Sequence, residues 1–146
     1  MTTVSQVLRS KGSSVVTIGP TATIYEALTL MSEKNIGALV VVQDEKIAGI
    51  FSERDYARKV ILEGRSSKET LVSDLMTPKV FCVKASRTME ECMMLMSDKH
   101  IRHLPVVENN KLSGIVTMRD VIKAVVANKE NTIRDLENYI QGGYTG

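Results

Sequence analysis

Residues 15–60 recur 65 positions later, as residues 80–125, without a gap. Of the 46 aligned pairs 17 are identical, and most of the others exchange similar residues. A duplicated unit is typical of a pseudo-symmetric fold in which any site occurs twice, near the boundary between the copies. Two copies are too few for a solenoid, which needs about three to bury a continuous core. We therefore expect the copies to pack face to face as one compact domain.

Size and composition narrow the possible classes of protein. A chain of 146 residues can bury a sufficient core without a disulfide or a metal. The net charge of +2 and the few scattered aromatic residues argue against direct contact with nucleic acid or an anionic membrane surface. We expect no membrane span and no secretory signal. Cys82 and Cys92 lie in apolar patterns and are expected to be buried free thiols in a reducing cytoplasm.

Each copy is predicted to fold as strand, helix, strand, strand and helix. Thr21 or Thr23 is expected to cap the first helix, and continuous apolar segments joined by polar turns predict a buried hairpin. The elements predicted in the first copy are a strand at 15–18, a helix including 24–31, a hairpin of 39–42 and 47–51, and a helix capped by Ser52. Those of the second copy are a strand at 80–83, a helix at 86–99, a hairpin of 104–107 and 112–117, and a helix from Thr117 to about residue 128.

Segments outside the copies also carry patterns. Residues 4–8 and 71–76 are predicted lead-in helices, and the polar residues 63–68 a linker. The spacing of Ile133, Leu136 and Ile140 predicts a last amphipathic helix at 132–141 that packs inward, or alternatively contacts a partner. Gly142 and Gly143 are expected to end it, before a loose tail.

The same polar motif follows the second hairpin strand in both copies. Its members are a hydroxyl, an arginine and an aspartate, namely Ser52, Arg54 and Asp55, then Thr117, Arg119 and Asp120. A helix start favours anions, a carboxylate suits the vicinal hydroxyls of a ribose, and an arginine suits phosphate. The same spacing is also a capping box, which only stabilises a helix end, and duplication copies caps as well as sites. Both interpretations stay open.

The apolar hairpin, the Gly-x-x-Ser/Thr-x-x-Asp motif and the preceding Ile-Arg-His-Leu-Pro-Val-Val at 101–107 together resemble the CBS domain, named for cystathionine β-synthase. The resemblance covers repeats at 8–62 and 71–127 of a single module at 1–146, which ends in a C-terminal helix and tail at 130–146. It implies an α/β fold of two tandem repeats with pseudo-two-fold symmetry. It also implies two clefts for adenosine-containing ligands such as AMP, ADP, ATP, S-adenosylmethionine or NAD, and a homodimer without catalysis.

By this resemblance, each cleft takes its ribose carboxylate from one repeat and its adenine wall from the other. The first cleft would use Asp120, Thr117 and Arg119, a wall of Val16, Ile36, Gly37 and Ala38, and Lys11 near the phosphates. The second would use Asp55, Ser52 and Arg54, facing Phe81, Ile101, Arg102 and His103. Because Arg102 and His103 replace Gly37 and Ala38, we expect the second cleft to prefer phosphorylated or longer ligands.

We therefore expect a stand-alone cytoplasmic regulatory module that binds an adenosine nucleotide and relays its state to an unidentified partner protein. A bridging ligand can shift the angle between the repeats only as far as it binds one angle better. The alternative is a structural dimerisation module with non-functional clefts. An enzyme would need a base, a nucleophile or a metal cluster beside the phosphates, and the sequence shows none of these. The Met-rich helix face of Met89, Cys92, Met93 and Met96 is typical of a core or dimer stripe rather than a metal site.

Overall fold

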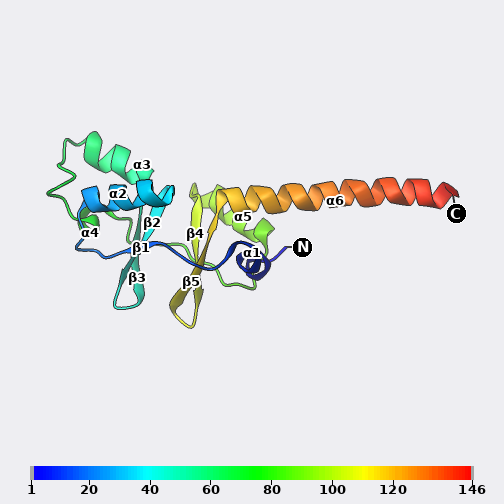
Figure 1. Ribbon diagram of the computed structural model, residues 1–146, viewed down its shortest axis with the longest axis horizontal. Helices are drawn as coiled ribbons and strands as arrows, with labels where there is room; N and C mark the ends of the chain where they lie inside the picture. Colours follow the sequence, from blue (N-terminus) through cyan, green and yellow to red (C-terminus); the bar gives the residue numbers. More distant parts are fainter. Residues whose placement is uncertain (1, 146) are drawn as a thin grey trace.

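Two α/β repeats lie side by side, and a long helix leaves the second repeat (Figure 1). The computed structural model describes residues 2–145, except for the side chains of 131–132 and 139–145. The predicted fold class, α/β with two tandem repeats, is confirmed. In chain order the elements are α1 (Val4–Lys11), β1 (Thr17–Ile18), α2 (Ile24–Lys34), β2 (Ala38–Gln43), β3 (Lys46–Ser52), α3 (Glu53–Asp55), η1 (Tyr56–Ile61), α4 (Val72–Leu75), α5 (Met89–Lys99), β4 (His103–Glu108), β5 (Lys111–Thr117) and α6 (Met118–Thr145).

Each repeat contains an antiparallel hairpin, β2 with β3 and β4 with β5. In the first repeat β1 runs parallel to β2 and completes a three-stranded sheet. The strand predicted at 80–83 is wrong, because only Val83 forms a bridge, to Val106. Pro105 stands where β2 has Val40, which pairs with Thr17 of β1. Since proline has no N–H to donate, the second repeat cannot complete the same ladder.

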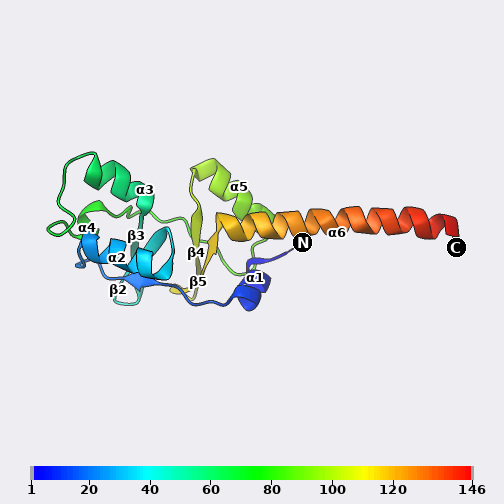
Figure 2. The same ribbon diagram turned by 45° about the horizontal axis from the view of Figure 1, so that its top comes forward.

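The two lead-in helices are exchanged between the repeats. The short helix α4, which precedes the second repeat, packs against the core of the first, where Val72 is fully buried. The helix α1, which precedes the first repeat, packs against the core of the second, where Val4 is fully buried. Both views show α1 beside the second repeat and α4 beside the first (Figures 1 and 2). Each core is therefore closed by a segment that precedes the other repeat.

Matching glycines make room for the exchange. A Cβ atom built on Gly49 would lie 2.7 Å from the Met76 sulfur, and one on Gly114 would lie 2.7 Å from a Leu8 methyl carbon. These distances are shorter than real carbon contacts, so a side chain at either position would displace the lead-in. The glycine of each Gly-x-x-Ser/Thr-x-x-Asp motif thus admits the lead-in.

Several local predictions differ from the structure. Of the two predicted caps for α2, Thr21 and Thr23, the structure uses Thr23. The helix after Ser52 continues as the π-helix η1. Cys82 is exposed rather than buried, as is Thr17 at the equivalent position of β1. Both cysteines are free.

The largest difference concerns the C-terminal segment. The predicted break near residue 128 is absent, and α6 is one helix of 28 residues that also passes through Gly142 and Gly143. No proline or glycine interrupts it between 118 and 141, so nothing in the sequence stops the helix there. Ile133 and Leu136 do not point inward, since they are 56% and 58% exposed. The side chain of Ile140 lies outside the described residues.

Candidate functional site

Both predicted capping boxes are present. The Ser52 amide donates to Asp55 Oδ2 at 2.9 Å, and the Asp55 amide donates to Ser52 Oγ at 3.2 Å. The Thr117 amide donates to Asp120 Oδ2 at 2.9 Å, and the Asp120 amide donates to Thr117 Oγ1 at 3.2 Å. The aspartates therefore stabilise their helix starts, and any ligand role would be additional to capping.

The Asp120 cluster joins Lys11, Thr117 and Asp120. Lys11, in the last turn of α1, donates from Nζ to Asp120 Oδ2 at 2.6 Å, so two predicted site residues 109 positions apart meet directly. Burial acts to raise the pKa of Asp120, but the hydrogen bonds from Lys11 and from Thr117 outweigh it and hold the pKa below its usual value. Both hydrogen bonds end on Oδ2.

The Asp55 cluster joins Ser52, Asp55 and Lys59. Lys59 lies one turn after Asp55 and approaches its Oδ1 at 3.3 Å. The Lys59 ammonium also donates to the Leu75 carbonyl at 3.1 Å, at the end of α4. The position of Lys59 is taken by Ala124 in the second repeat. Lys59 was not among the predicted site residues, although it follows Asp55 by four residues in the sequence.

Other predicted residues bridge the repeats. Arg54 donates from Nη1 to the His100 carbonyl at 3.2 Å. Burial lowers the pKa of His103, helped by Arg102 and Lys11 and opposed by Glu53. His103 therefore lies within electrostatic range of charges from both halves of the chain, and its ring is held towards the neutral form. Glu53 was not among the predicted site residues.

Two lysines not predicted for the site cover Phe81, a predicted adenine wall. The ammonium of Lys99 lies 5.1 Å from the ring centre and that of Lys79 lies 5.7 Å away, within cation–π range. Lys79 follows Met76 by three residues, as Lys11 follows Leu8. The two lead-ins lie 68 positions apart, whereas the two copies lie 65 positions apart. A separate alignment of the lead-ins would have identified Lys79 as the counterpart of Lys11.

The remaining predicted residues are not gathered at one surface. Their apolar side chains mostly pack against the core of their own repeat: Val16 and Ile36 in the first, Phe81 and Ile101 in the second, with Ala38 buried. Arg102 and Arg119 are exposed. The backbone carbonyls of Gly37 and Arg102 accept from the helix starts, from the Glu53 amide at 3.0 Å and the Met118 amide at 2.9 Å.

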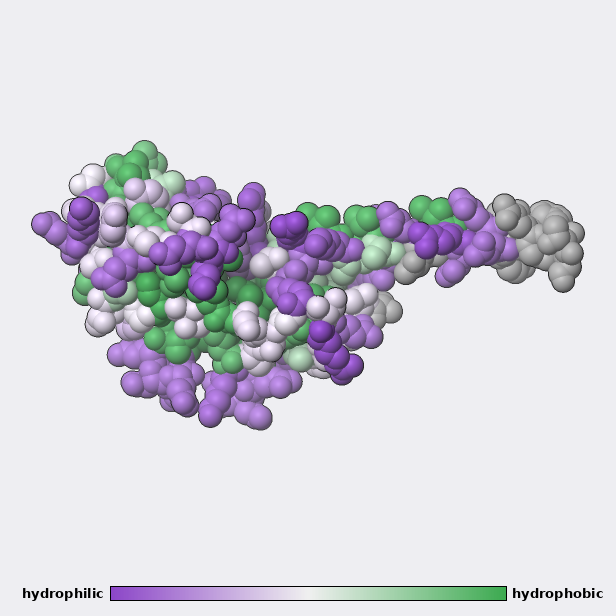
Figure 3. Space-filling model, in the orientation of Figure 1, coloured by the Kyte–Doolittle hydropathy of each residue, from purple (hydrophilic) through white to green (hydrophobic). Residues whose placement is uncertain are grey.

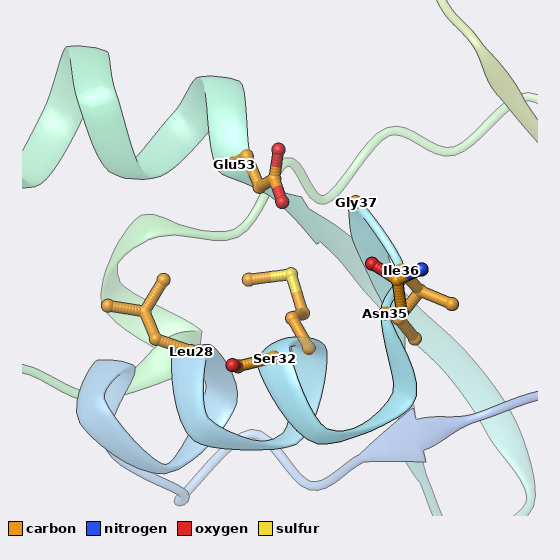
Figure 4. A pocket seen from close by; sticks show the side chains of 7 residues that line it. Leu28, Ser32, Asn35, Ile36, Gly37 and Glu53 are labelled. Carbon is orange, nitrogen blue, oxygen red and sulfur yellow. The ribbon is translucent and has the colours of Figure 1, made fainter.

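A pocket of about 440 Å³ opens beside the start of α3 (Figure 4). Glu53 faces Leu28 and Ser32 of α2 across it, and the predicted wall residues Ile36 and Gly37 line one side. The lining comes entirely from the first repeat and includes neither aspartate. Among the described residues, no group of three His, Cys, Asp or Glu side chains could hold a metal ion, and no helix has both the length and the apolar character of a membrane span.

The family model of the CBS domain matches residues 4–62 and 72–127. The chain therefore belongs to the CBS domain family, and its two matches make it a CBS domain pair.

Relatives and solved structures agree with this assignment. The mitochondrial CBS domain-containing protein CBSX3 of Arabidopsis thaliana is 42% identical over 98% of this chain and 74% of its own length. An inosine-5′-monophosphate dehydrogenase of Methanocaldococcus jannaschii is 37% identical over 75% of this chain, but only 21% of that enzyme is covered. The match therefore covers a minor part of the enzyme.

Among solved structures, a protein with CBS domains from Burkholderia ambifaria has a TM-score of 0.84 and 48% identity, covering 86% of this chain and 95% of that one. A hexameric CBS-CP12 protein from bloom-forming cyanobacteria has a TM-score of 0.73 and 28% identity, covering 82% and 66%. A CBS domain pair solved with 5′-methylthioadenosine and S-adenosyl-L-methionine has a TM-score of 0.78, covering 88% and 98%. Its 24% identity shows the shared fold alone.

Proposed function

We propose that this CBS domain pair binds an adenosine nucleotide, AMP, ADP, ATP or an NAD-type ligand, at the Asp120 and Asp55 clusters. Binding shifts the angle between the two repeats, and a partner protein responds to this change. In this role the module catalyses no reaction. It acts as a homodimer in the cytoplasm. Self-association has a precedent in the hexameric cyanobacterial neighbour, and adenosine binding in the neighbour with 5′-methylthioadenosine.

The observation that carries the proposal is the contact between Lys11 and Asp120. A carboxylate and a cation from distant segments lie 2.6 Å apart beside a helix start. Because both protein hydrogen bonds to Asp120 use Oδ2, a ribose hydroxyl can donate to Oδ1. In the proposed complex, Lys11 turns from the carboxylate towards a ligand phosphate.

The proposed sites differ in charge. Arg54 neighbours Asp55 in the sequence, and Lys79 and Lys99 lie over Phe81, the proposed facing wall. Arg102 is proposed to line the same site. We propose that this site takes the more highly phosphorylated or longer ligand. At the Asp120 site Lys11 is already paired, so a ligand there must compete with an internal ion pair.

A thermal-shift panel of AMP, ADP, ATP, NAD, NADH and S-adenosylmethionine identifies the ligand. A ligand at 100 times its Kd stabilises the folded state by about 2.7 kcal/mol. Calorimetry with the identified ligand should then count two sites, and Asp120→Ala and Asp55→Ala should each remove one. The matched control is Asp135→Ala on the exposed part of α6. Unchanged stoichiometry in both site variants would remove these residues from the sites.

The second candidate is a structural dimerisation module. The favouring observation is that both aspartates already serve as caps. This alternative predicts no thermal shift with any adenine nucleotide at millimolar concentration, whereas turnover of ATP or NAD by the pure protein would contradict both candidates.

A further inference from the structure

Most of α6 extends beyond the body of the protein (Figures 1 and 2). Its first turns pack against the second repeat, where Val121 and Ala124 are 1% and 9% exposed. All side chains described between 129 and 138 are exposed. A helix without tertiary contacts is marginal in water at this length, because packing supplies most helical stability in proteins. A partner surface would therefore stabilise this part of α6.

The exposed apolar residues of α6 form one line, here called the outer stripe. It consists of Ile122, Val126, Ile133 and Leu136, which are 55%, 47%, 56% and 58% exposed. At about 100° per residue, their steps of four, seven and three place them in a band roughly 80° wide. The buried Val121 and Ala124 lie on a different side. Hydrophobic patches recur along the projecting helix in Figure 3.

The spacing of the outer stripe is that of a coiled-coil seam. Val126 and Ile133 are β-branched residues seven apart, and Leu136 follows at the alternate position of the heptad. Lys129 occupies the one seam position between Ile122 and Leu136 that is not apolar. A single polar residue in a seam specifies register and partner at some cost in stability. A continuous apolar groove on an unrelated protein would gain nothing from this lysine.

The charges of α6 determine which partner is complementary. Its first part, 118–129, carries three basic residues and one acidic residue: Arg119, Lys123, Lys129 and Asp120. The part at 130–145 carries three acidic residues and one basic residue: Glu130, Asp135, Glu137 and Arg134. A parallel copy would align like charges, whereas an antiparallel copy aligns each part with its opposite.

We propose that the outer stripe pairs with the outer stripe of a second copy of this chain in antiparallel orientation. In the register that places Val126 opposite Leu136, Lys129 lies opposite Ile133 near the centre. Its ammonium can reach the acidic residues of the second helix. The two bodies then lie at opposite ends of the helix pair. The pairing uses no residue of either aspartate cluster and does not depend on the proposed nucleotide binding.

Cross-linking tests both the surface and its direction. The background variant is Cys82→Ser, because Cys82 is exposed, whereas burial raises the pKa of Cys92 to about 11 and leaves it unreactive. Val126→Cys protein and Leu136→Cys protein are mixed and mildly oxidised. The expected product is a disulfide-linked pair containing one chain of each, with little product from either alone. A disulfide-linked pair formed by the Val126→Cys protein alone would show that the helices are parallel and would overturn the proposed orientation. The absence of any product would overturn the surface.

Sedimentation of the full chain provides an independent measurement. Ile133→Glu with Leu136→Glu should halve the mass at a concentration where the wild type is associated. The control Asn138→Glu adds one negative charge on another side of the helix, at an exposed position, and should leave the mass unchanged. Because these residues lie outside both cores, thermal unfolding of the body should stay the same. Equal mass for the double variant and the wild type would overturn the proposal.

Discussion

The two aspartate clusters share one backbone arrangement, but their aspartates pair with lysines from different parts of the fold. At each, a hydroxyl cap and an aspartate close the start of a helix, and the lead-in helix of the other repeat packs nearby. At Asp120 the cation is Lys11 of the lead-in itself. At Asp55 it is Lys59 of the same helix, which reaches the lead-in only through the Leu75 carbonyl.

The comparison shows how a duplicated side-chain cluster can diverge without changing the fold. Lys79 follows Met76 by three residues, as Lys11 follows Leu8, but the Lys79 ammonium lies over the Phe81 ring and not on Asp55. Asp55 pairs with Lys59 instead. One cluster is thus tied across the molecule by an ion pair, whereas the ion pair of the other is local.

The largest effects should come from closing the space for the lead-ins. Gly49→Ala and Gly114→Ala should each lower the free energy of unfolding by about 1–3 kcal/mol through overpacking. Gly49→Ala should cost more, since its Cβ would also meet the Thr77 carbonyl at 2.9 Å, whereas Gly114 meets only the Leu8 side chain. Urea denaturation measures both, with Gly19→Ala as the control because open space surrounds Gly19. The opposite order would show that α1, not α4, is the more rigid lead-in.

A smaller effect is the difference in coupling energy between the two ion pairs, which double-mutant cycles measure. The cycle of Lys11→Met with Asp120→Asn should give a coupling of about 1 kcal/mol, the upper end for partly exposed pairs. The cycle of Lys59→Met with Asp55→Asn should give about 0.3–0.5 kcal/mol, as for other i,i+4 helix pairs. Chemical denaturation of the four variants in each cycle supplies the values. Equal couplings would remove the energetic distinction between the clusters.

The smallest effect concerns pH. Because the pKa of Asp120 is lowered in the folded state, its pairing stabilises the protein above the unfolded pKa of about 3.9 and is lost as the pH falls through the folded pKa. The stability difference between the wild type and Lys11→Met should therefore be constant from about pH 7 to pH 5 and shrink below about pH 4. In an Asp120→Asn background, Lys11→Met should show no such pH dependence. A difference that persists at low pH would assign the effect of Lys11 to packing.

Local signals carried most of the sequence-based prediction. The hairpins, the caps at Ser52 and Thr117, and the paired repeats follow from apolar periodicity and cap chemistry. The exchange of the lead-ins did not follow, because sequence spacing identifies a helix but not the core against which it packs. The predicted strand at 80–83 does not form, because Pro105 of the neighbouring strand has no N–H to donate. This effect can be predicted only when it is known which strand lies beside residues 80–83.

For the candidate site, the sequence identified the two aspartates and Lys11 but not the other cations. Lys79 was missed because the ungapped alignment does not extend into the lead-ins, and Lys99 because its partner Phe81 is distant in sequence. On α6, the apolar spacing of Ile133 and Leu136 was recognised. The inward packing predicted for them is wrong, whereas the alternative of a partner contact stays open, because periodicity defines an apolar face without stating what covers it.

The exchanged lead-ins also affect how the chain is made. While the protein emerges from the ribosome, the first repeat lacks Val72 and Leu75, which fill its interior, until synthesis has passed Met76. Until then a hydrophobic hollow stays open in the first repeat. The surface on which α1 docks forms later still, because it consists of residues of the second repeat. Neither repeat can therefore complete its core from its own residues alone, as an independent domain does.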